Sequence, residues 1–102
     1  MTTTLIDDHR VEIADLCRTY GVRRLDVFGS VVRDDFDPER SDVDFLVEFE
    51  PGAVPPLSRY FRLRDALAAI VGHPVDLVTA RAVRNPYIKA AIESERRLVY
   101  AA

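Results

Sequence analysis

The chain has 102 residues, of which 48% are hydrophobic and 30% are charged, and its formal net charge is −3. This length suits one compact domain, expected over residues 1–102, and the acidic balance argues against direct nucleic-acid binding. No apolar run approaches the ~20 residues of a membrane span, and the N-terminal residues lack the apolar segment of a secretory signal. A single cysteine, Cys17, cannot form an intramolecular disulfide, so we expect a cytoplasmic protein with Cys17 as a core residue.

The predicted elements alternate between helices and strands from the start of the chain. Apolar residues at helical spacing predict an amphipathic helix over residues 5–20. Residues 24–28 predict a strand, and Ser30 is expected to cap a short helix over residues 30–36. Residues 42–50 alternate and are rich in valine and phenylalanine, which predicts a second strand.

The second half of the chain continues the same alternation. A helix is predicted over residues 57–71, a strand over 75–79, a helix over 86–95 that begins at a proline, and a short strand or extended tail over 98–100. One face of the helix over 57–71 is expected to carry Leu57, Tyr60, Phe61, Arg64, Leu67, Ala68 and Val71. This order predicts an α/β or α+β domain, in which a small mixed β-sheet is flanked by helices.

Two aspartates begin the second predicted strand. Side chains alternate along a strand, so Asp42 and Asp44 face one side and Val43 faces the other. Two carboxylates held ~6–7 Å apart repel each other unless a cation neutralises them. Oxygen ligands on a rigid strand suit Mg²⁺, which keeps positions open for phosphate oxygens. The pair therefore indicates a site for a divalent metal ion.

A glycine turn and a third aspartate are expected at the same edge of the sheet. The turn Gly29-Ser30 meets the aspartate pair only if the first two strands are antiparallel. Glycine allows a ligand to approach the backbone, and N–H groups that open a helix can bind an anion. A helix connects the second and third strands, which favours a parallel crossover and brings Asp76 to this edge. Three carboxylates beside such a turn predict two Mg²⁺ ions and in-line displacement at a triphosphate.

Each feature taken alone has an ordinary structural explanation. Most Asp-x-Asp sequences are solvated strand ends, most Gly-Ser pairs are simple turns, and Asp76 could be an exposed strand residue. Asp34, Asp35 and Asp37 lie in a loop without a partner on the same face, so we expect them to be solvated charges. The ordered combination of the other features favours a metal and nucleotide site.

This combination resembles the minimal nucleotidyltransferases of the DNA polymerase β superfamily, including the MntA-like antitoxins of HEPN/MNT toxin–antitoxin systems. The family signature is Gly-Ser, a short connector, Asp-x-Asp and a later aspartate. Here it reads Gly29-Ser30, eleven residues, Asp42-Val-Asp44, and Asp76 within PVDLV. The C-terminal NPYIKAAIESERRLVYA is also similar to the family's ending, so the resemblance covers about residues 8–101.

The resemblance implies a role for each matching residue. Asp42, Asp44 and Asp76 would bind Mg²⁺, with two ions expected, and Asp76 would help to deprotonate the acceptor. Gly29 and Ser30 would hold phosphate of ATP or another nucleoside triphosphate. Arg33 matches the family's Gly-Ser-x-x-Arg-Gly pattern and would contact phosphate, although it could equally be a surface arginine. Asp34 replaces the glycine that ends this pattern and adds a negative charge.

The resemblance also implies an acceptor on another molecule. Related antitoxins are encoded beside HEPN-domain ribonuclease toxins and transfer AMP to a tyrosine of the toxin, so we expect a hetero-oligomer with such a toxin. The alternative is a non-catalytic antitoxin that neutralises the toxin by contact alone. A template-dependent polymerase is disfavoured, because the net charge is negative and no template-binding region is evident.

Overall fold

A four-stranded mixed sheet forms the centre of the computed structural model, which describes residues 4–52 and 56–102. The strands lie in the order β3-β2-β1-β4, and β1 is antiparallel to both β2 and β4 whereas β2 is parallel to β3. Their bounds are β1 Val22–Phe28, β2 Val43–Phe49, β3 Val75–Thr79 and β4 Arg97–Ala101. The mixed sheet and both expected pairings of β2 are confirmed.

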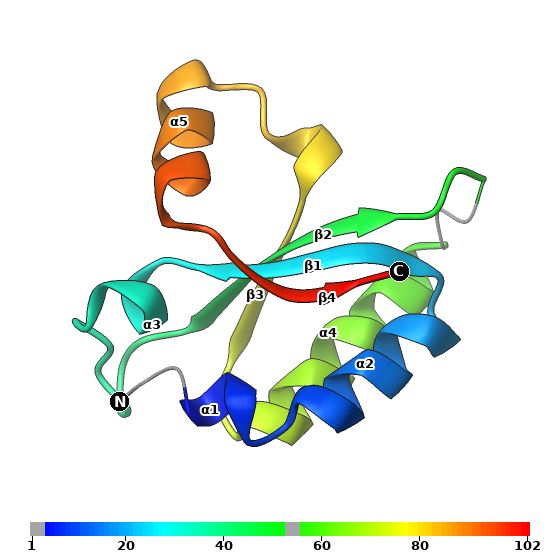
Figure 1. Ribbon diagram of the computed structural model, residues 1–102, viewed down its shortest axis with the longest axis horizontal. Coiled ribbons are helices and arrows are strands. Elements are labelled where there is room, and N and C mark those ends of the chain that lie inside the picture. The colour runs from blue at the N-terminus through cyan, green and yellow to red at the C-terminus, as the bar shows by residue number, and fades with distance from the viewer. Residues whose placement is uncertain (1–3, 53–55) are drawn as a thin grey trace.

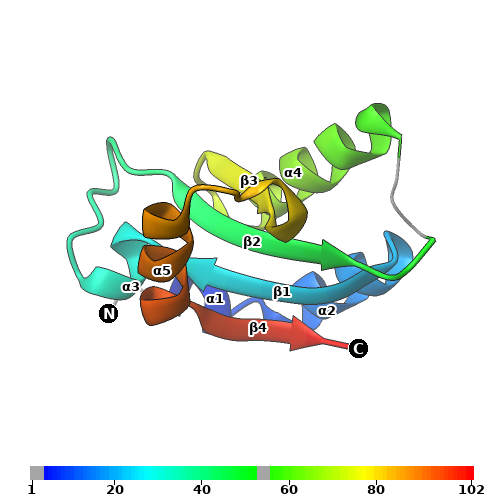
Figure 2. The same cartoon turned by 90° about the horizontal axis from the view of Figure 1, so that it is seen from above.

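Helices cover the two faces of the sheet unequally. Their bounds are α1 Thr4–Asp7, α2 Arg10–Thr19, α3 Ser30–Arg33, α4 Leu57–Val71, the 3₁₀ helix η1 Ala80–Ala82 and α5 Pro86–Glu95. The two helices α2 and α4 pack on one face, and α5 stands on the opposite face near α3 (Figures 1 and 2). Among the described residues, no helix has both the length and the apolar character needed to cross a membrane.

The core lies between the sheet and the helices α2 and α4. On β2 the side chains of Val43, Phe45 and Val47 are almost completely buried, as the alternating sequence predicts. Cys17 of α2 is buried in the same cluster, and burial raises the pKa of its thiol to about 12. The expectation that Cys17 fills the core is therefore confirmed.

Two predicted helices have different bounds in the structure. The helix expected over residues 5–20 is divided into α1 and α2 by a turn at Asp8 and His9, where the N–H of His9 donates to the carbonyl of Ile6 at 3.0 Å. No proline or glycine marks this turn in the sequence. The short helix expected over residues 30–36 ends at Arg33, because Asp34 takes a left-handed conformation with φ 71°.

The predicted face of α4 was wrong in its first turns, although the bounds of the helix are confirmed. Its buried residues are Leu63, Leu67 and Val71, whereas Leu57 and Phe61 are 69% and 39% exposed. The buried stripe is rotated toward Leu63, which faces the core between α2 and the sheet. Phe61 instead lies beside the guanidinium of Arg64, 4.7 Å from ring centroid to Arg64 Cζ.

Candidate active site

The predicted aspartates lie where three strands meet α3. In the antiparallel pair, Phe28 at the end of β1 is opposite Asp44 at the start of β2. In the parallel pair, Asp44 is opposite Asp76 of β3. Asp42 precedes β2 by one residue. The topology thus brings the three carboxylate residues and the turn after β1 to one edge of the sheet.

The carboxylate of Asp44 is electrostatically disfavoured in its charged form. Its pKa is raised from 3.8 to about 6, mainly by burial and then by the negative charges of Asp76 and Asp42. Arg33 opposes this shift, while Glu95 adds to it. Asp44 therefore lies among three acidic groups that act on it together, and a bound cation would relieve this repulsion.

Gly29 packs directly against the Asp44 carboxylate in a backbone conformation that favours glycine. A Cβ atom at position 29 would lie 2.2 Å from Asp44 Oδ2, far inside van der Waals contact. The backbone of Gly29 has φ 80° and ψ −151°, a conformation that is available almost only to glycine. The turn therefore needs a glycine for its backbone conformation, and the missing side chain leaves room for the Asp44 carboxylate where it lies.

The role expected for Ser30 as a helix cap was wrong. Gly29 is the N-cap residue of α3, and Ser30 is already the first residue of the helix. As a glycine, the N-cap residue has no side chain that could cap α3. The backbone carbonyl of Gly29 accepts from the N–H groups of Val32 and Arg33 at 3.0 and 3.1 Å.

The side chain of Arg33 joins α3 to the end of α5. Its Nη1 donates to Glu95 Oε2 at 2.6 Å, and its Nε lies 3.6 Å from Asp35 Oδ2. Sequence reasoning did not select Glu95, because residues 33 and 95 are separated by 62 positions and belong to different helices. Nothing in the local sequence signals this contact.

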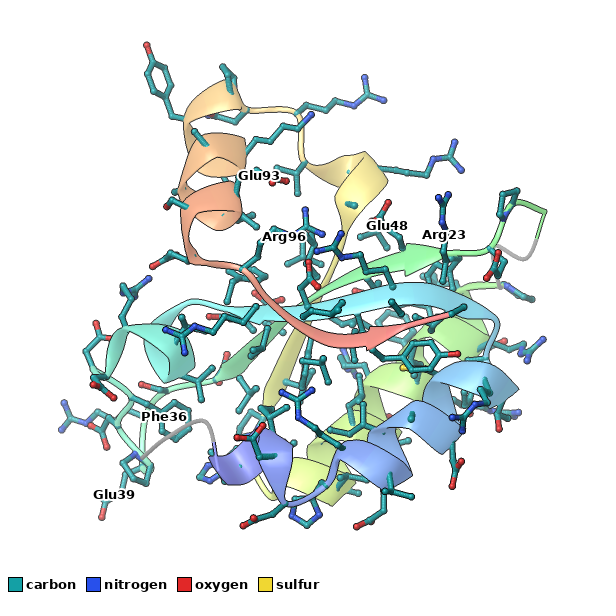
Figure 3. All side chains as sticks on the ribbon, in the orientation of Figure 1. Arg23, Phe36, Glu39, Glu48, Glu93 and Arg96 are labelled. Carbon is teal, nitrogen blue, oxygen red and sulfur yellow. The ribbon has the colours of Figure 1, made fainter. Side chains whose placement is uncertain are left out.

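Besides Glu95, the sequence analysis also missed a buried acidic residue of β1, Asp26. Its side chain is completely buried on β1, where it accepts from Arg24 Nε at 3.1 Å and from Arg96 Nε. Arg96 follows α5 and also donates to Glu93 at 2.7 Å; Figure 3 labels both at the end of α5 that reaches the sheet. An aspartate inside the apolar strand sequence RLDVF was the signal, since a buried charge needs a partner.

The acidic connector between α3 and β2 is solvent-exposed, as expected for Asp34, Asp35 and Asp37. Asp37 Oδ1 accepts from the backbone N–H of Glu39 at 2.9 Å, which stabilises the turn. Asp34 is the one non-glycine residue with positive φ among those described. Its φ of 71° explains why a glycine suits this position of the motif.

The residues at the sheet edge fit a magnesium ion by their chemistry. They offer carboxylate oxygens, which Mg²⁺ prefers, and their mutual repulsion at Asp44 is the kind that a cation removes. Within residues 4–52 and 56–102, no three histidine, cysteine, aspartate or glutamate side chains already converge on a single point suited to a metal. Binding would therefore require the aspartate side chains to turn toward a common centre.

A cavity of about 680 Å³ lies at the other end of β2, away from the aspartates. It is bounded by the C-terminal residues of β2, the start of α4 and η1, including Phe49, Tyr60 and Arg81. The aspartates lie at the N-terminal ends of β2 and β3 instead. The groups suited to phosphate and metal chemistry are therefore outside this cavity.

Comparison with known proteins agrees with this geometry. Residues 12–99 match the family described as "Nucleotidyltransferase domain". The chain is 35% identical over 97 residues to protein adenylyltransferase MntA of Thermococcus cleftensis, which covers 95% of this chain and 89% of the relative. It is 40% identical over 81 residues to a proposed protein adenylyltransferase of Methanocaldococcus jannaschii, with 79% and 78% covered.

Solved structures share the arrangement of helices and strands. The structure of a proposed minimal nucleotidyltransferase superposes with a TM-score of 0.72 at 35% identity, and 89% of each chain is covered. A tri-AMPylated HEPN toxin of Shewanella oneidensis in complex with its MNT antitoxin gives a TM-score of 0.66 at 18% identity, with 94% and 72% covered. At that identity the second match concerns the fold alone.

Proposed function

Because this chain belongs to the family of nucleotidyltransferase domains, we propose that it transfers AMP from ATP to a hydroxyl group of a partner protein. The single observation that carries the proposal is the pairing of Asp44 with Asp76, beside a glycine turn that no larger residue could form. Paired carboxylates next to a phosphate-binding turn are suited to phosphoryl-group chemistry. The names of two relatives, both protein adenylyltransferases, support AMP as the transferred group.

Each residue of the site has a proposed task. Asp42, Asp44 and Asp76 would hold Mg²⁺, which when bound neutralises charge on the phosphates and on the leaving pyrophosphate. Gly29 and Ser30 line the turn beside the phosphates, where the missing side chain of Gly29 leaves the backbone accessible to them. Arg33 supplies a positive charge at the entrance of an otherwise acidic site.

The proposed reaction is a single in-line displacement. The acceptor oxygen forms a bond to the α-phosphorus of ATP, and the bond from that phosphorus to the oxygen bridging to the β-phosphate breaks. Pyrophosphate leaves with the electron pair of the broken bond. The proton of the acceptor hydroxyl passes to the carboxylate of Asp76, which lies on the outer strand of the three that form the site.

We propose that the acceptor is a tyrosine of a HEPN-type ribonuclease toxin, and that the modification makes this chain an antitoxin. The family resemblance suggests this partner. The tri-AMPylated HEPN toxin in the solved complex is an instance in which a chain of the same fold accompanies such a toxin. A tyrosine hydroxyl is a suitable acceptor, because it reaches beyond the surface of its own protein and can enter an open site.

The proposal is tested by incubating the purified chain with a HEPN-type toxin, ATP and Mg²⁺. We expect a mass increase of the partner by whole AMP groups, located on tyrosine by fragmentation, and no increase when EDTA replaces Mg²⁺. An unmodified partner in the presence of the wild-type chain would contradict the proposed activity.

A variant separates transfer from simple binding. The double substitution Asp42→Asn and Asp44→Asn should abolish the mass increase and the protection of cells that express the toxin. If this variant still protects fully, the chain acts as a non-catalytic antitoxin by contact. The exposed pair Asp7→Asn and Asp8→Asn, which removes the same number of charges from residues that are not among the proposed ligands, is the matched control.

A further inference from the structure

The ion pair between Arg33 and Glu95 joins the C-terminal end of α3 to the C-terminal end of α5. Arg33 is the last residue of α3, and Glu95 is the last residue of α5. Their side chains meet at 2.6 Å although Arg33 is half exposed, while Glu95 is only 19% exposed. A charge-assisted hydrogen bond of this length, with one partner largely shielded from water, restricts the guanidinium more than a surface pair would.

The end of α5 that carries Glu95 is itself fixed to the sheet. The next residue, Arg96, is 16% exposed and donates to the buried carboxylate of Asp26 on β1. Arg96 also donates to Glu93 one turn earlier on α5 at 2.7 Å. Figure 3 shows Arg96 where α5 passes into β4. Glu95 is therefore presented to Arg33 from an anchored backbone.

The pair lies beside the central aspartate. The backbone N–H of Arg33 donates to the carbonyl of Gly29 at 3.1 Å, and Gly29 packs directly against Asp44 Oδ2, so the single turn of α3 holds Arg33 and its partner Glu95 near the Asp44 carboxylate. A guanidinium has five N–H donors, so Arg33 can keep its bond to Glu95 and still donate to a phosphate oxygen. A phosphate that displaced Glu95 would instead leave an unpaired carboxylate beside its own negative charge.

We infer that Glu95 is a positioning residue of the nucleotide site, which holds the Arg33 guanidinium at the site entrance in the orientation that receives the phosphates. This inference rests on the proposed function, because it assumes that a nucleoside triphosphate binds at the aspartates. Glu95 acts through Arg33 and does not itself contact the nucleotide. The sequence assigns no role to Glu95, whereas the geometry places it as the principal partner of Arg33.

Removing Glu95 has two opposite effects, which a double-mutant cycle separates. The loss of a negative charge near the phosphates favours nucleotide binding in any background. The loss of the Arg33 anchor disfavours binding only where Arg33 is present. We therefore compare Glu95→Ala, Arg33→Gln and the combined variant by isothermal titration calorimetry with AMP-PNP and Mg²⁺. Alanine is a good helix former and preserves the last turn of α5.

We expect Glu95→Ala to weaken AMP-PNP binding by about 5- to 10-fold, the net loss typical of one hydrogen bond in a partly exposed position. In the Arg33→Gln background the same change should leave the Kd equal or slightly lower. Ser94→Ala is the control on the same helix, because Ser94 is exposed and its hydroxyl donates to the carbonyl of Ala91 at 2.8 Å, and the Kd of this variant should change by less than about twofold.

The outcomes distinguish this inference from the proposed function. If the wild type binds AMP-PNP and Glu95→Ala binds equally or more tightly in both backgrounds, Glu95 does not position Arg33. A lower melting temperature for Glu95→Ala with an unchanged Kd would assign Glu95 to folding and also overturn the inference. If the wild type itself binds no AMP-PNP, the nucleotide site of the proposed function fails, and the inference fails with it.

Discussion

Two carboxylates on the same sheet, Asp26 of β1 and Asp44 of β2, have opposite surroundings. Asp26 is completely buried, and its two oxygens accept from Arg24 and Arg96. Asp44 is less buried, and its pKa rises to about 6, first because of that burial and then because of the negative charges of Asp76 and Asp42. Asp26 is thus neutralised by two arginines of the same chain. Asp44 has acidic neighbours whose repulsion outweighs the opposing charge of Arg33.

We interpret this difference as one between a structural charge, Asp26, and the proposed functional charge, Asp44. A buried carboxylate with two arginine partners fixes the junction of α5 and β4 to β1, and it needs no counter-ion from solution. A carboxylate that is repelled by its neighbours reduces stability, and natural chains retain such groups mostly at functional sites. The comparison predicts that Asp26 substitutions damage the fold, while substitutions around Asp44 damage activity and can improve stability.

The largest expected effect is a loss of catalysis when an aspartate of the proposed metal site, Asp42, Asp44 or Asp76, is replaced. Asp76→Asn should lower the rate of AMP transfer by about a thousandfold, since a metal-binding carboxylate contributes several kcal/mol to transition-state stabilisation. The fold should be unchanged, because Asp76 is exposed. The measurement is the initial rate of partner AMPylation, with Asp65→Asn on α4 as an exposed control. Equal rates for Asp76→Asn and the control would remove Asp76 from the site.

The next largest effect is a loss of stability when the buried carboxylate of Asp26 is replaced. Asp26→Asn should reduce the free energy of unfolding by about 3 kcal/mol, because Arg96 loses the charge that balances it in a buried position. Urea unfolding followed by circular dichroism measures the change. The control Asp15→Asn removes an exposed partner of Arg18 and should cost less than about 0.5 kcal/mol. Similar losses for both variants would show that Asp26 is not a structural anchor.

A smaller effect, of opposite sign, is expected at Asp44 itself. The pKa of Asp44 is higher in the folded chain than its ordinary value of 3.8, so ionising it destabilises the fold as the pH rises from about 4 through 6. Asp44→Asn should therefore stabilise the metal-free protein by about 2 kcal/mol near pH 7.5, with little gain near pH 4. Melting temperatures at the two pH values provide the test. A loss of stability near pH 7.5 would contradict the repulsion at Asp44.

The smallest effect concerns the loop between the two groups. Asp34 has φ 71°, which costs an L-residue free energy that glycine avoids. Asp34→Gly should stabilise the protein by about 0.5–1 kcal/mol, after allowance for the entropy that glycine gains in the unfolded chain. Chemical unfolding measures the gain, and Asp35→Gly in the same loop should destabilise instead. A loss of stability with Asp34→Gly would show that the Asp34 side chain itself stabilises the turn.

The sequence predicted the parts of the site that depend on strand order. Alternation placed Asp42 and Asp44 together, and the connecting helix placed Asp76 beside Asp44, because such a connection favours parallel pairing. The contacts of Arg33 with Glu95 and of Asp26 with Arg96 join segments 62 and 70 residues apart. They depend on how α5 lies on the sheet, which no local pattern specifies. No local pattern in the sequence specifies the rotation of α4 or the break before α2 either, so both were missed.

The charge state of Asp44 tests the central claim most directly. Carbon-detected NMR can follow the side-chain carboxyl of Asp44 through a pH titration, first without metal and then with Mg²⁺ and AMP-PNP. We predict a pKa near 6 without metal, and a marked decrease when Mg²⁺ and the nucleotide are bound. A pKa near 3.8 that Mg²⁺ and nucleotide leave unchanged would contradict the claim that Asp44 is repelled by its neighbours and binds a cation.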